Sequence, residues 1–347
     1  MVTVAERYAH VVGIDTHART HTYCIIESRT GGIVDTQMFP TTNPGMSRAI
    51  SWLRRRTGKT VLAAVEGTSS YGAGITTALS AESVDVAEIR PLYRRSRART
   101  GKSDPLDAEA AARTALTLNV EKLSQPRRGD DRAELRVLLA SRSLIDHQCT
   151  ANKNALTALL RTNDLGIDAR RPLTAKQVGE IARWRTGRND NVRSLIRGEG
   201  RRLARTIIEQ TTLLDRNHHA LSTLTEALAP GLQDIPGVGA VTGAIVVTSY
   251  SHHGRVRSEA AFAALGGIAP LPASSGNATR HRLSRSGDRQ LNRAVDVVVR
   301  SRMSYDPVTS KYVERRRGEG LSNREIRRCL KRYVCRPLYR ELRTRMA

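Results

Sequence analysis

The pattern of apolar and polar positions in the first third of the chain predicts an alternation of strands and helices. Apolar runs over 9–15, 21–28 and 32–39 are expected to form strands, and the turn sequence between the last two makes an antiparallel meander. The elements that we expect next are, in chain order, a helix over 44–56, a strand over 60–66, a helix over 71–81, a strand over 84–89 and a helix from Ser103 to about Leu118.

Capping residues mark two of these helix starts. Pro44 favours a first helical position, with Asn43 as its N-cap, and Ser103 is expected to cap a helix whose first turn is acidic. Three strands followed by helix, strand, helix, strand and helix is the element order of a ribonuclease-H-like α/β fold. We therefore expect an α/β domain at the N-terminus, with the linker 124–129 at its end.

The middle of the chain has a helical rather than a strand-like pattern. Apolar residues recur at helical spacing from Asp130 to about Arg161, Pro172 interrupts the pattern, and a second long helix is expected from Asn191 to Leu228. These segments are rich in Arg and Ala and poor in Gly. They predict an extended hairpin or coiled coil, an arm that would mediate assembly, nucleic-acid contact or both.

A further, mainly α-helical module is predicted to begin at Pro230. Helices are expected over 258–266, 284–303 and 321–345. The turn that contains Gly237 and Gly239 resembles the hairpin of a helix-hairpin-helix motif, in which glycines let backbone N–H groups approach a phosphate. A simple glycine turn between two packed helices is the alternative interpretation.

The net charge of the chain indicates which class of molecule it binds. The chain has 347 residues, with 57 Lys and Arg against 33 Asp and Glu, a net charge of +24, and the residues from 251 onward carry +14 of it. This imbalance indicates a polyanion such as nucleic acid, bound mainly through its phosphates. Aromatic residues are only 4% of the chain, which argues against stacking on single strands as the main binding mode.

The cysteines and the hydropathy point to an intracellular protein. The four cysteines show no zinc-site spacing, so reduced thiols are expected. The sequence shows no signal peptide and no apolar run long enough to span a membrane. We therefore expect a soluble cytoplasmic protein.

Four acidic residues stand where carboxylates can converge. Asp15 and Glu66 each close an apolar strand run, and Asp104 and Asp107 lie three apart on one helix face. Carboxylates from separate elements that meet at one point bind Mg²⁺ or Mn²⁺ in phosphoryl-transfer sites. Isolated solvated carboxylates are the alternative for any one of them. His17 and His21 lie near Asp15, and a metal-ligand role is the alternative to the solvated loop histidines that we expect.

A Gly-, Pro- and Ser-rich segment over 267–283 carries a second candidate site. Ser275 precedes Gly276 and is followed by a cluster of basic residues, of which we take Arg280, Arg282, Arg285 and Arg289 as candidate phosphate contacts. A serine in such a setting has the ingredients of a nucleophile that forms a phosphoserine, if a base takes its proton. A solvated loop is the alternative, and the tandem Ser274 is a rival nucleophile.

These motifs, in this order and separation, resemble the DEDD transposases of bacterial insertion sequences, also called bridge-RNA-guided recombinases. The segments that carry the resemblance are Val12–His17, Val65–Thr68, Lys102–Ala108, Gly267–Gly276 and Gly287–Leu291. Between Gly287 and Arg293 the sequence departs from the Gly-Asn and Leu-Arg that the family more often has.

The resemblance implies three domains: a RuvC-like acidic domain over 1–123, a coiled-coil arm over 124–229 and a transposase domain with the catalytic serine over 230–347. It also implies that Asp15, Glu66, Asp104 and Asp107 form a Mg²⁺ site. Ser275 would form the covalent link to double-stranded donor and target DNA, and a structured RNA would guide the choice of site. The expected assembly is a dimer or tetramer, associated with the bacterial nucleoid.

Two other functions remain open from the sequence. A RuvC-like Holliday-junction resolvase would use the acidic residues to hydrolyse DNA without a serine link. A basic nucleic-acid-binding protein with a degenerate nuclease fold would catalyse nothing.

Overall fold

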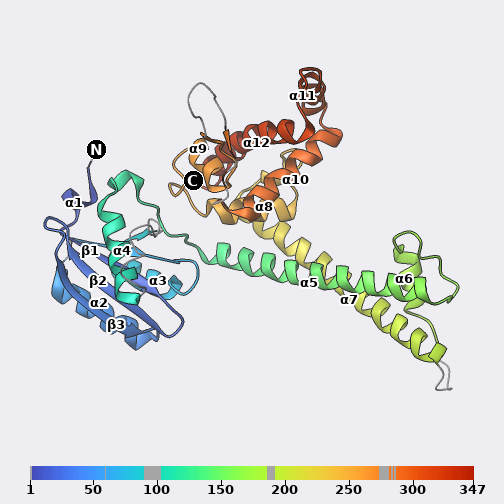
Figure 1. Ribbon diagram of the computed structural model, residues 1–347, viewed down its shortest axis with the longest axis horizontal. Helices are drawn as coiled ribbons and strands as arrows, with labels where there is room; N and C mark the ends of the chain where they lie inside the picture. Colours follow the sequence, from blue (N-terminus) through green and yellow to red (C-terminus); the bar gives the residue numbers. More distant parts are fainter. Residues whose placement is uncertain are drawn as a thin grey trace. The chain divides into compact units, whose positions relative to one another are not determined.

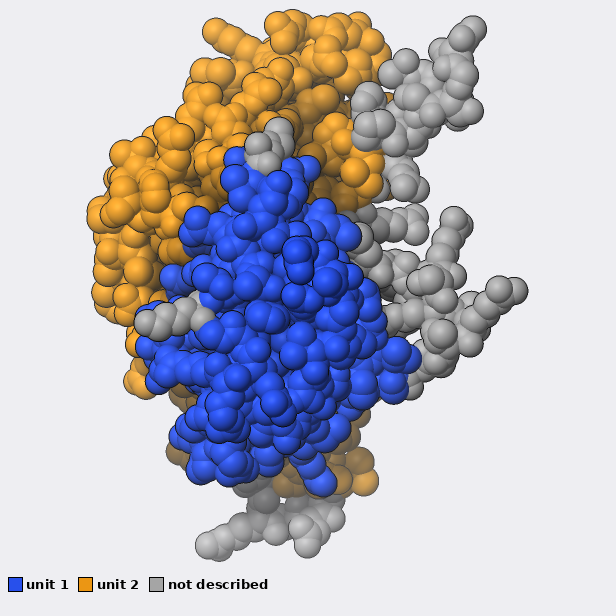
Figure 2. All heavy atoms as spheres, turned by 90° about the vertical axis from the view of Figure 1, so that its left-hand side faces the viewer, with its two compact units in different colours: residues 1–128 blue, residues 129–347 orange. Residues whose placement is uncertain are grey.

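The structure, a computed structural model, describes residues 2–58, 60–89, 103–185, 192–272, 281–282, 284 and 287–347. The chain forms two compact units, Met1–Arg128 and Gly129–Ala347, which Figure 2 draws in different colours. Each unit is described by itself. Among the described residues, no helix is both long and apolar enough to cross a membrane.

The first unit is built on a sheet (Figure 1) whose described strands follow the order β3-β2-β1-β4-β5. Their bounds are β1 His10–Thr16, β2 Thr20–Glu27, β3 Ile33–Pro40, β4 Val61–Val65 and β5 Asp85–Glu88. The first three strands form the expected antiparallel meander, and β4 and β5 run parallel to β1. The expected mixed α/β domain is therefore confirmed, and its strand order is consistent with a ribonuclease-H-like fold.

Helices cover both faces of this sheet. The helices α2 (Asn43–Thr57) and α3 (Ala73–Ala81) pack on one face, around Trp52, Ile75 and the alternate strand residues that point to them. On the other face lie α1 (Val4–Arg7) and α4 (Asp104–Leu116), with a short 3₁₀ turn at Val120–Lys122. Successive strand residues point to opposite faces, which makes both faces apolar in β1.

Small residues let α4 lie directly on the sheet. The buried face of α4 is made of alanines: Ala108, Ala111, Ala112 and Ala115. They face Gly13 of β1, where an added Cβ would lie 1.9 Å from the carbonyl oxygen of Ala108. Only glycine fits between the two backbones, and this close approach brings the start of α4 to the end of β1.

Two long helices dominate the start of the second unit. They are α5 (Asp130–Thr162) and α7 (Val192–Leu228), which pack against each other and hold α6 (Ala175–Ile181) near the far end (Figure 1). Their buried contacts include Leu156, Leu160 and Leu203. The two long helices are confirmed, whereas the division of this unit into an arm and a separate domain stays a prediction.

The rest of the second unit is a helical bundle with one short strand pair. After a 3₁₀ turn at Leu232–Asp234 come α8 (Ala240–Tyr250), α9 (Glu259–Leu265), β6 (Leu271–Pro272), β7 (His281–Arg282), α10 (Arg289–Tyr305), α11 (Pro307–Gly318) and α12 (Asn323–Arg345). The core lies among α8, α10 and α12, around Tyr250, Val298 and Leu338. The mostly helical C-terminal region is confirmed.

The structure corrects two capping predictions and adds helices. Thr42, not Asn43, caps α2, because its side chain accepts a hydrogen bond from the Gly45 amide. Ser103 stands at the N-cap position of α4, but its side chain makes no capping hydrogen bond. The helices α1, α6, α8 and α11 were not expected from the sequence.

Candidate metal centre and nucleic-acid interface

The acidic centre of the first unit is built around Asp15, near the end of β1. Asp15 has the same parity in the strand as Val11 and Gly13, so its side chain points to the face covered by α4. The residue is only 7% exposed. The strand thus presents a carboxylate to the N-terminal turn of α4, where a helix favours negative charge.

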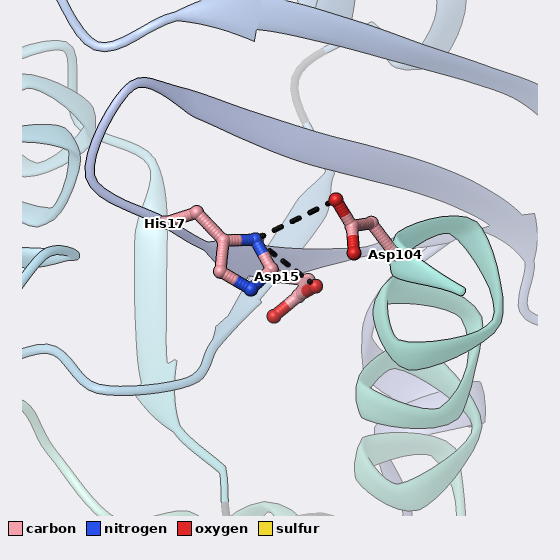
Figure 3. Close-up of side chains that lie close together, drawn as sticks. All are labelled: Asp15, His17 and Asp104. Atoms are coloured by element: carbon pink, nitrogen blue, oxygen red, sulfur yellow. Dashed lines mark ion pairs between the residues drawn. The ribbon is translucent and has the colours of Figure 1, made fainter. Parts of the chain in front are cut away.

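His17 and Asp104 complete this group (Figure 3). The His17 Nδ1 atom lies 3.5 Å from Asp15 Oδ2 and 3.7 Å from Asp104 Oδ2. One possible ligand atom from each residue falls within 4.8 Å of the other two. His17 lies in the loop after β1 with its side chain 46% exposed, as expected, yet it joins this group. The expectation of a solvated loop histidine is wrong for His21, which is buried in β2.

The remaining two predicted carboxylates lie close enough to act on Asp15 electrostatically. Glu66 follows β4, held beside β1 by two hydrogen bonds: its amide donates to the Ile14 carbonyl and its carbonyl accepts from the Thr16 hydroxyl. Asp107 lies one turn into α4. The structure thus gathers the four predicted carboxylates near the carboxyl ends of β1 and β4. Glu66 and Asp107 are not members of the tight group with His17.

Burial is the main cause that raises the pKa of Asp15 to about 6, and the neighbouring His17 opposes the rise. The negative charges of the other three acidic residues raise it further: Asp107, Asp104 and Glu66. Carboxylates crowded in this way repel one another unless a proton or a cation lies between them. The group is therefore a place where a cation would relieve electrostatic strain.

The donor set fits a hard divalent cation. Asp15 Oδ2 and His17 Nδ1 are buried and have no hydrogen-bond partner. A buried polar atom without a partner costs free energy, which a metal ligand bond would recover. Carboxylate oxygens suit Mg²⁺ and Mn²⁺, and an imidazole nitrogen favours Mn²⁺ more than Mg²⁺. Residues Asp15, His17 and Asp104 would hold the ion, with Glu66 and Asp107 near it.

The predicted hairpin of the second unit is a tight turn before α8. Gly237 has a φ of +84°, and an added Cβ there would lie 2.9 Å from the Val298 carbonyl oxygen. Gly239 is the N-cap of α8, and its amide donates to the Thr242 hydroxyl. The turn borders an open hollow of about 610 Å³. Its contact with nucleic acid stays a prediction.

The predicted nucleophile lies outside the described residues, as do Ser274, Gly276, Arg280 and Arg285. Arg282 belongs to β7, but its side chain is not described. The two ends of the segment that carries Ser275 are nevertheless placed, because β6 pairs with β7. Gly267 precedes β6 and Gly287 follows β7. An added Cβ on Gly287 would lie 2.2 Å from the Gly267 amide nitrogen, so the backbones of these two residues are in direct contact.

A basic cavity lies beside both ends of that segment. It has a volume of about 810 Å³ and borders Gly266, Gly267 and Gly287. Its cationic side chains come from two helices: Arg289 and Arg293 from α10, and Arg324, Arg327, Arg328 and Lys331 from α12. Asp296 at its wall holds Lys331 at 2.9 Å. Of the predicted phosphate contacts, Arg289 is the one whose described side chain lines this cavity.

Comparison with known proteins agrees with this arrangement. A family model for DEDD transposases of IS110 type, described as "Transposase", matches residues 12–163. A second model, "Transposase IS116/IS110/IS902 family", matches residues 229–314. The chain belongs to the IS110 family of insertion-sequence transposases. The first match contains all four predicted carboxylates, and the second contains Ser275 and the hairpin turn.

A curated relative of this IS110-family chain comes from Streptomyces coelicolor (strain ATCC BAA-471 / A3(2) / M145). It is the "Insertion element IS110 uncharacterized 43.6 kDa protein", and it is 33% identical over 103 residues. The match covers 29% of this chain and 25% of the relative. The chain thus aligns with about a quarter of the relative's length.

Sequence reasoning missed His17 as a member of the acidic group. The signal was present, because position 17 is two residues after Asp15 and therefore points to the same side of an extended chain. The α12 side chains of the basic cavity were also missed. Helical periodicity alone does not tell which basic face of a terminal helix will meet another helix.

Proposed function

We propose that this protein is a DNA transposase of an insertion sequence, which cuts and rejoins DNA through a phosphoserine link assisted by the acidic centre. The observation that carries the proposal is the meeting of Asp15, His17 and Asp104 in a chain that belongs to the IS110 family. The net charge of +24 supports a DNA substrate, because a basic surface attracts a polyanion.

In the proposed reaction, Ser275 Oγ attacks a phosphodiester phosphorus. A serine–phosphorus bond forms, the bond from phosphorus to one deoxyribose oxygen breaks, and the serine proton ends on that leaving oxygen. The free hydroxyl of a second strand then attacks the phosphoserine, which restores the serine and joins the strands. Because each step exchanges one phosphate ester for another, the reaction needs no external energy source.

The acidic residues would position a divalent cation and balance its positive charge during this reaction. A divalent cation held there would stabilise negative charge on the phosphate oxygens. Asp15 and Asp104 would keep its ligand positions fixed, since β1 and α4 are locked together at Gly13. In the second unit, the basic cavity would hold the phosphate backbone next to the serine-bearing segment, with Arg289 as one contact.

The finer parts of the proposal concern the partners and the compartment. We propose double-stranded donor and target DNA as substrates, a structured guide RNA, and a dimer or tetramer as the active assembly, in the bacterial cytoplasm and near the nucleoid. The paired helices α5 and α7 offer a long surface for such assembly. RNA that copurifies with the active protein, extracted and sequenced, tests the guide.

A denaturing gel tests the covalent step. Purified protein is incubated with Mg²⁺ and labelled DNA that contains an end of the element, and protein-linked DNA is separated from free DNA. The expected result is a protein–DNA adduct in wild type that is absent in Ser275→Ala and retained in Ser274→Ala. An adduct that persists in Ser275→Ala and disappears in Ser274→Ala would move the role to the neighbouring serine.

The same gel separates the alternatives. A Holliday-junction resolvase would release nicked DNA with free ends and no adduct, and cleavage would survive in Ser275→Ala. A non-catalytic nucleic-acid-binding protein would leave the DNA intact under all conditions. Either pattern would contradict the phosphoserine mechanism.

A further inference from the structure

A second pocket in the C-terminal unit combines aromatic rings with arginines. It lies between α11 and α12 and has a volume of about 520 Å³, within the range of small-molecule binding pockets. Two tyrosines form its aromatic part, and Ile268 and Pro270 add apolar surface from the segment before β6. Much of this pocket, including all its α12 residues, lies beyond the family match that ends at residue 314.

The two tyrosines form an aromatic pair of which one ring is largely exposed. Tyr312 and Tyr333 meet edge to face, with ring centroids 5.7 Å apart, and Tyr333 is 53% exposed. A tyrosine this exposed contributes little to the core. Burial raises the pKa of Tyr312, so its ring stays neutral at physiological pH. The pair is therefore an aromatic platform at the protein surface.

Arginines surround this platform. The Arg315 guanidinium lies 5.4 Å from the Tyr312 ring centroid, and that of Arg336 lies 5.5 Å from the Tyr333 centroid. Arg328 also lines the pocket, and none of the described lining residues is acidic. An aromatic ring flanked by guanidinium groups can stack a base and pair with its phosphate.

Two further arginines each carry a buried nitrogen atom that makes no hydrogen bond, although Nη1 of Arg316 pairs with Glu319. The Nε atom of Arg316 and the Nη1 atom of Arg332 are buried and make no hydrogen bond. Both residues line the pocket. A buried guanidinium nitrogen without an acceptor costs free energy, and a phosphate or base oxygen in the pocket would satisfy it.

We propose that this pocket binds an unpaired nucleotide of a single-stranded nucleic acid, with the base on Tyr333 and the phosphate among the arginines. A base inside a duplex cannot reach the pocket, because both of its faces are already stacked. The site shares Ile268 and Arg328 with the basic cavity, but it contains neither Ser275 nor any residue of the acidic centre. The strand has two possible sources, an RNA or a displaced DNA strand.

Binding of fluorescein-labelled 12-residue oligonucleotides by the full-length protein tests the proposal. We expect Tyr333→Ala to weaken binding of single strands about fivefold or more, because stacking contributes about 1–3 kcal/mol per base. Tyr333→Phe should stay within about threefold of wild type, since it keeps the ring. Affinity for duplex DNA of the same sequence should change less than about twofold. Parallel titrations with single-stranded RNA and DNA identify the source of the strand.

Cys329 provides a local readout in the same pocket. It is half-buried and lines the pocket, whereas Cys24, Cys149 and Cys335 are buried. We expect saturating single strand to slow the alkylation of Cys329 by iodoacetamide at least about fivefold in wild type. Duplex should give no such protection, and Tyr333→Ala should lose it. Peptide mass spectrometry identifies the alkylated cysteine.

The control variant is Val308→Ala on α11. Val308 is 76% exposed and does not line the pocket, so single-strand binding should remain as in wild type. Unchanged thermal unfolding of Tyr333→Ala excludes a folding defect. The proposal is overturned if Tyr333→Ala binds single strands as tightly as wild type. It is equally overturned if the variant loses duplex and single-strand affinity alike, or if duplex protects Cys329 as well as single strand does.

Discussion

The acidic centre of the first unit and the basic cavity of the second hold their charges in opposite ways. The acidic centre uses short side chains on backbones that touch at Gly13, so its ligand atoms have little freedom. The basic cavity uses long side chains such as Arg289, which project from α10 and α12 toward solvent. Short ligands on locked backbones suit an ion that demands fixed geometry, whereas long arginines suit a mobile polyanion.

Because of this difference, we expect single substitutions to impair the acidic centre more than the basic cavity. In the acidic centre, one lost carboxylate removes a ligand that nothing else can replace. In the basic cavity, six cationic side chains among the described residues share the charge, so one loss is partly covered by the rest. Three substitutions and one change of pH test this contrast, in order of decreasing expected effect.

The largest effect is expected for Asp15→Asn. The variant keeps the shape of the side chain but removes the buried charge at the centre, so DNA cleavage should fall at least about a hundredfold to a thousandfold. Cleavage of labelled element ends with Mg²⁺ measures it. Asp146→Asn, an exposed carboxylate on α5, is the control and should cleave as wild type. Cleavage by Asp15→Asn within about tenfold of wild type would remove the acidic centre from the reaction.

Gly13→Ala should destabilise the first unit by about 3 kcal/mol, because the new methyl group meets the α4 backbone at 1.9 Å. Denaturant unfolding followed through Trp52, in a Trp184→Phe background, reports on this unit. Gly74→Ala is the matched control, since its new Cβ would meet only the flexible Met46 side chain at 3.5 Å. Equal stability of the two variants would show that β1 and α4 can separate without cost.

Acid should weaken metal binding by about tenfold per pH unit below pH 6. The raised pKa of Asp15 means that a proton occupies the carboxylate in this range and competes with the cation. Above about pH 7 Asp15 is ionised, and the affinity should become constant. Mn²⁺ titrations between pH 5 and pH 8 measure the curve. A flat curve down to pH 5 would place the cation away from Asp15.

The smallest effect is expected for Arg289→Ala. Loss of one phosphate contact among several should weaken duplex binding about threefold to tenfold and lower the slope of log affinity against log salt by about one. Fluorescence anisotropy at several salt concentrations measures both. Arg170→Ala is the control, because this arginine is 88% exposed and paired with Asp168. A hundredfold loss for Arg289→Ala would contradict shared charge in the basic cavity.

The sheet and the four carboxylates could be predicted from sequence because their signals are local. Apolar runs that end in Asp15 and Glu66 define both the strands and the residues at their ends. The spacing of Asp104 and Asp107 fixes their common helix face. The structure then brings these elements together through β1–β4 pairing and the contact of α4 with Gly13.

The missed elements lacked such local signals. Helix α8 is buried on almost all sides, so it has no polar face and no helical period to detect. Helix α11 is mostly polar and its last turn contains three consecutive arginines, a pattern that is also typical of a charged loop. The Tyr312–Tyr333 pocket depends on a contact between two helices, and a single sequence does not record such a contact.

Mn²⁺ binding to the full-length protein tests the central claim, a preassembled acidic centre for a divalent cation, most directly. The signal of free Mn²⁺ in electron paramagnetic resonance measures the uptake, and the net charge of +24 suppresses non-specific cation binding. Wild type and Asp146→Asn should take up Mn²⁺, and Asp15→Asn should bind it at least about tenfold more weakly. Equal uptake by Asp15→Asn and wild type would contradict the central claim.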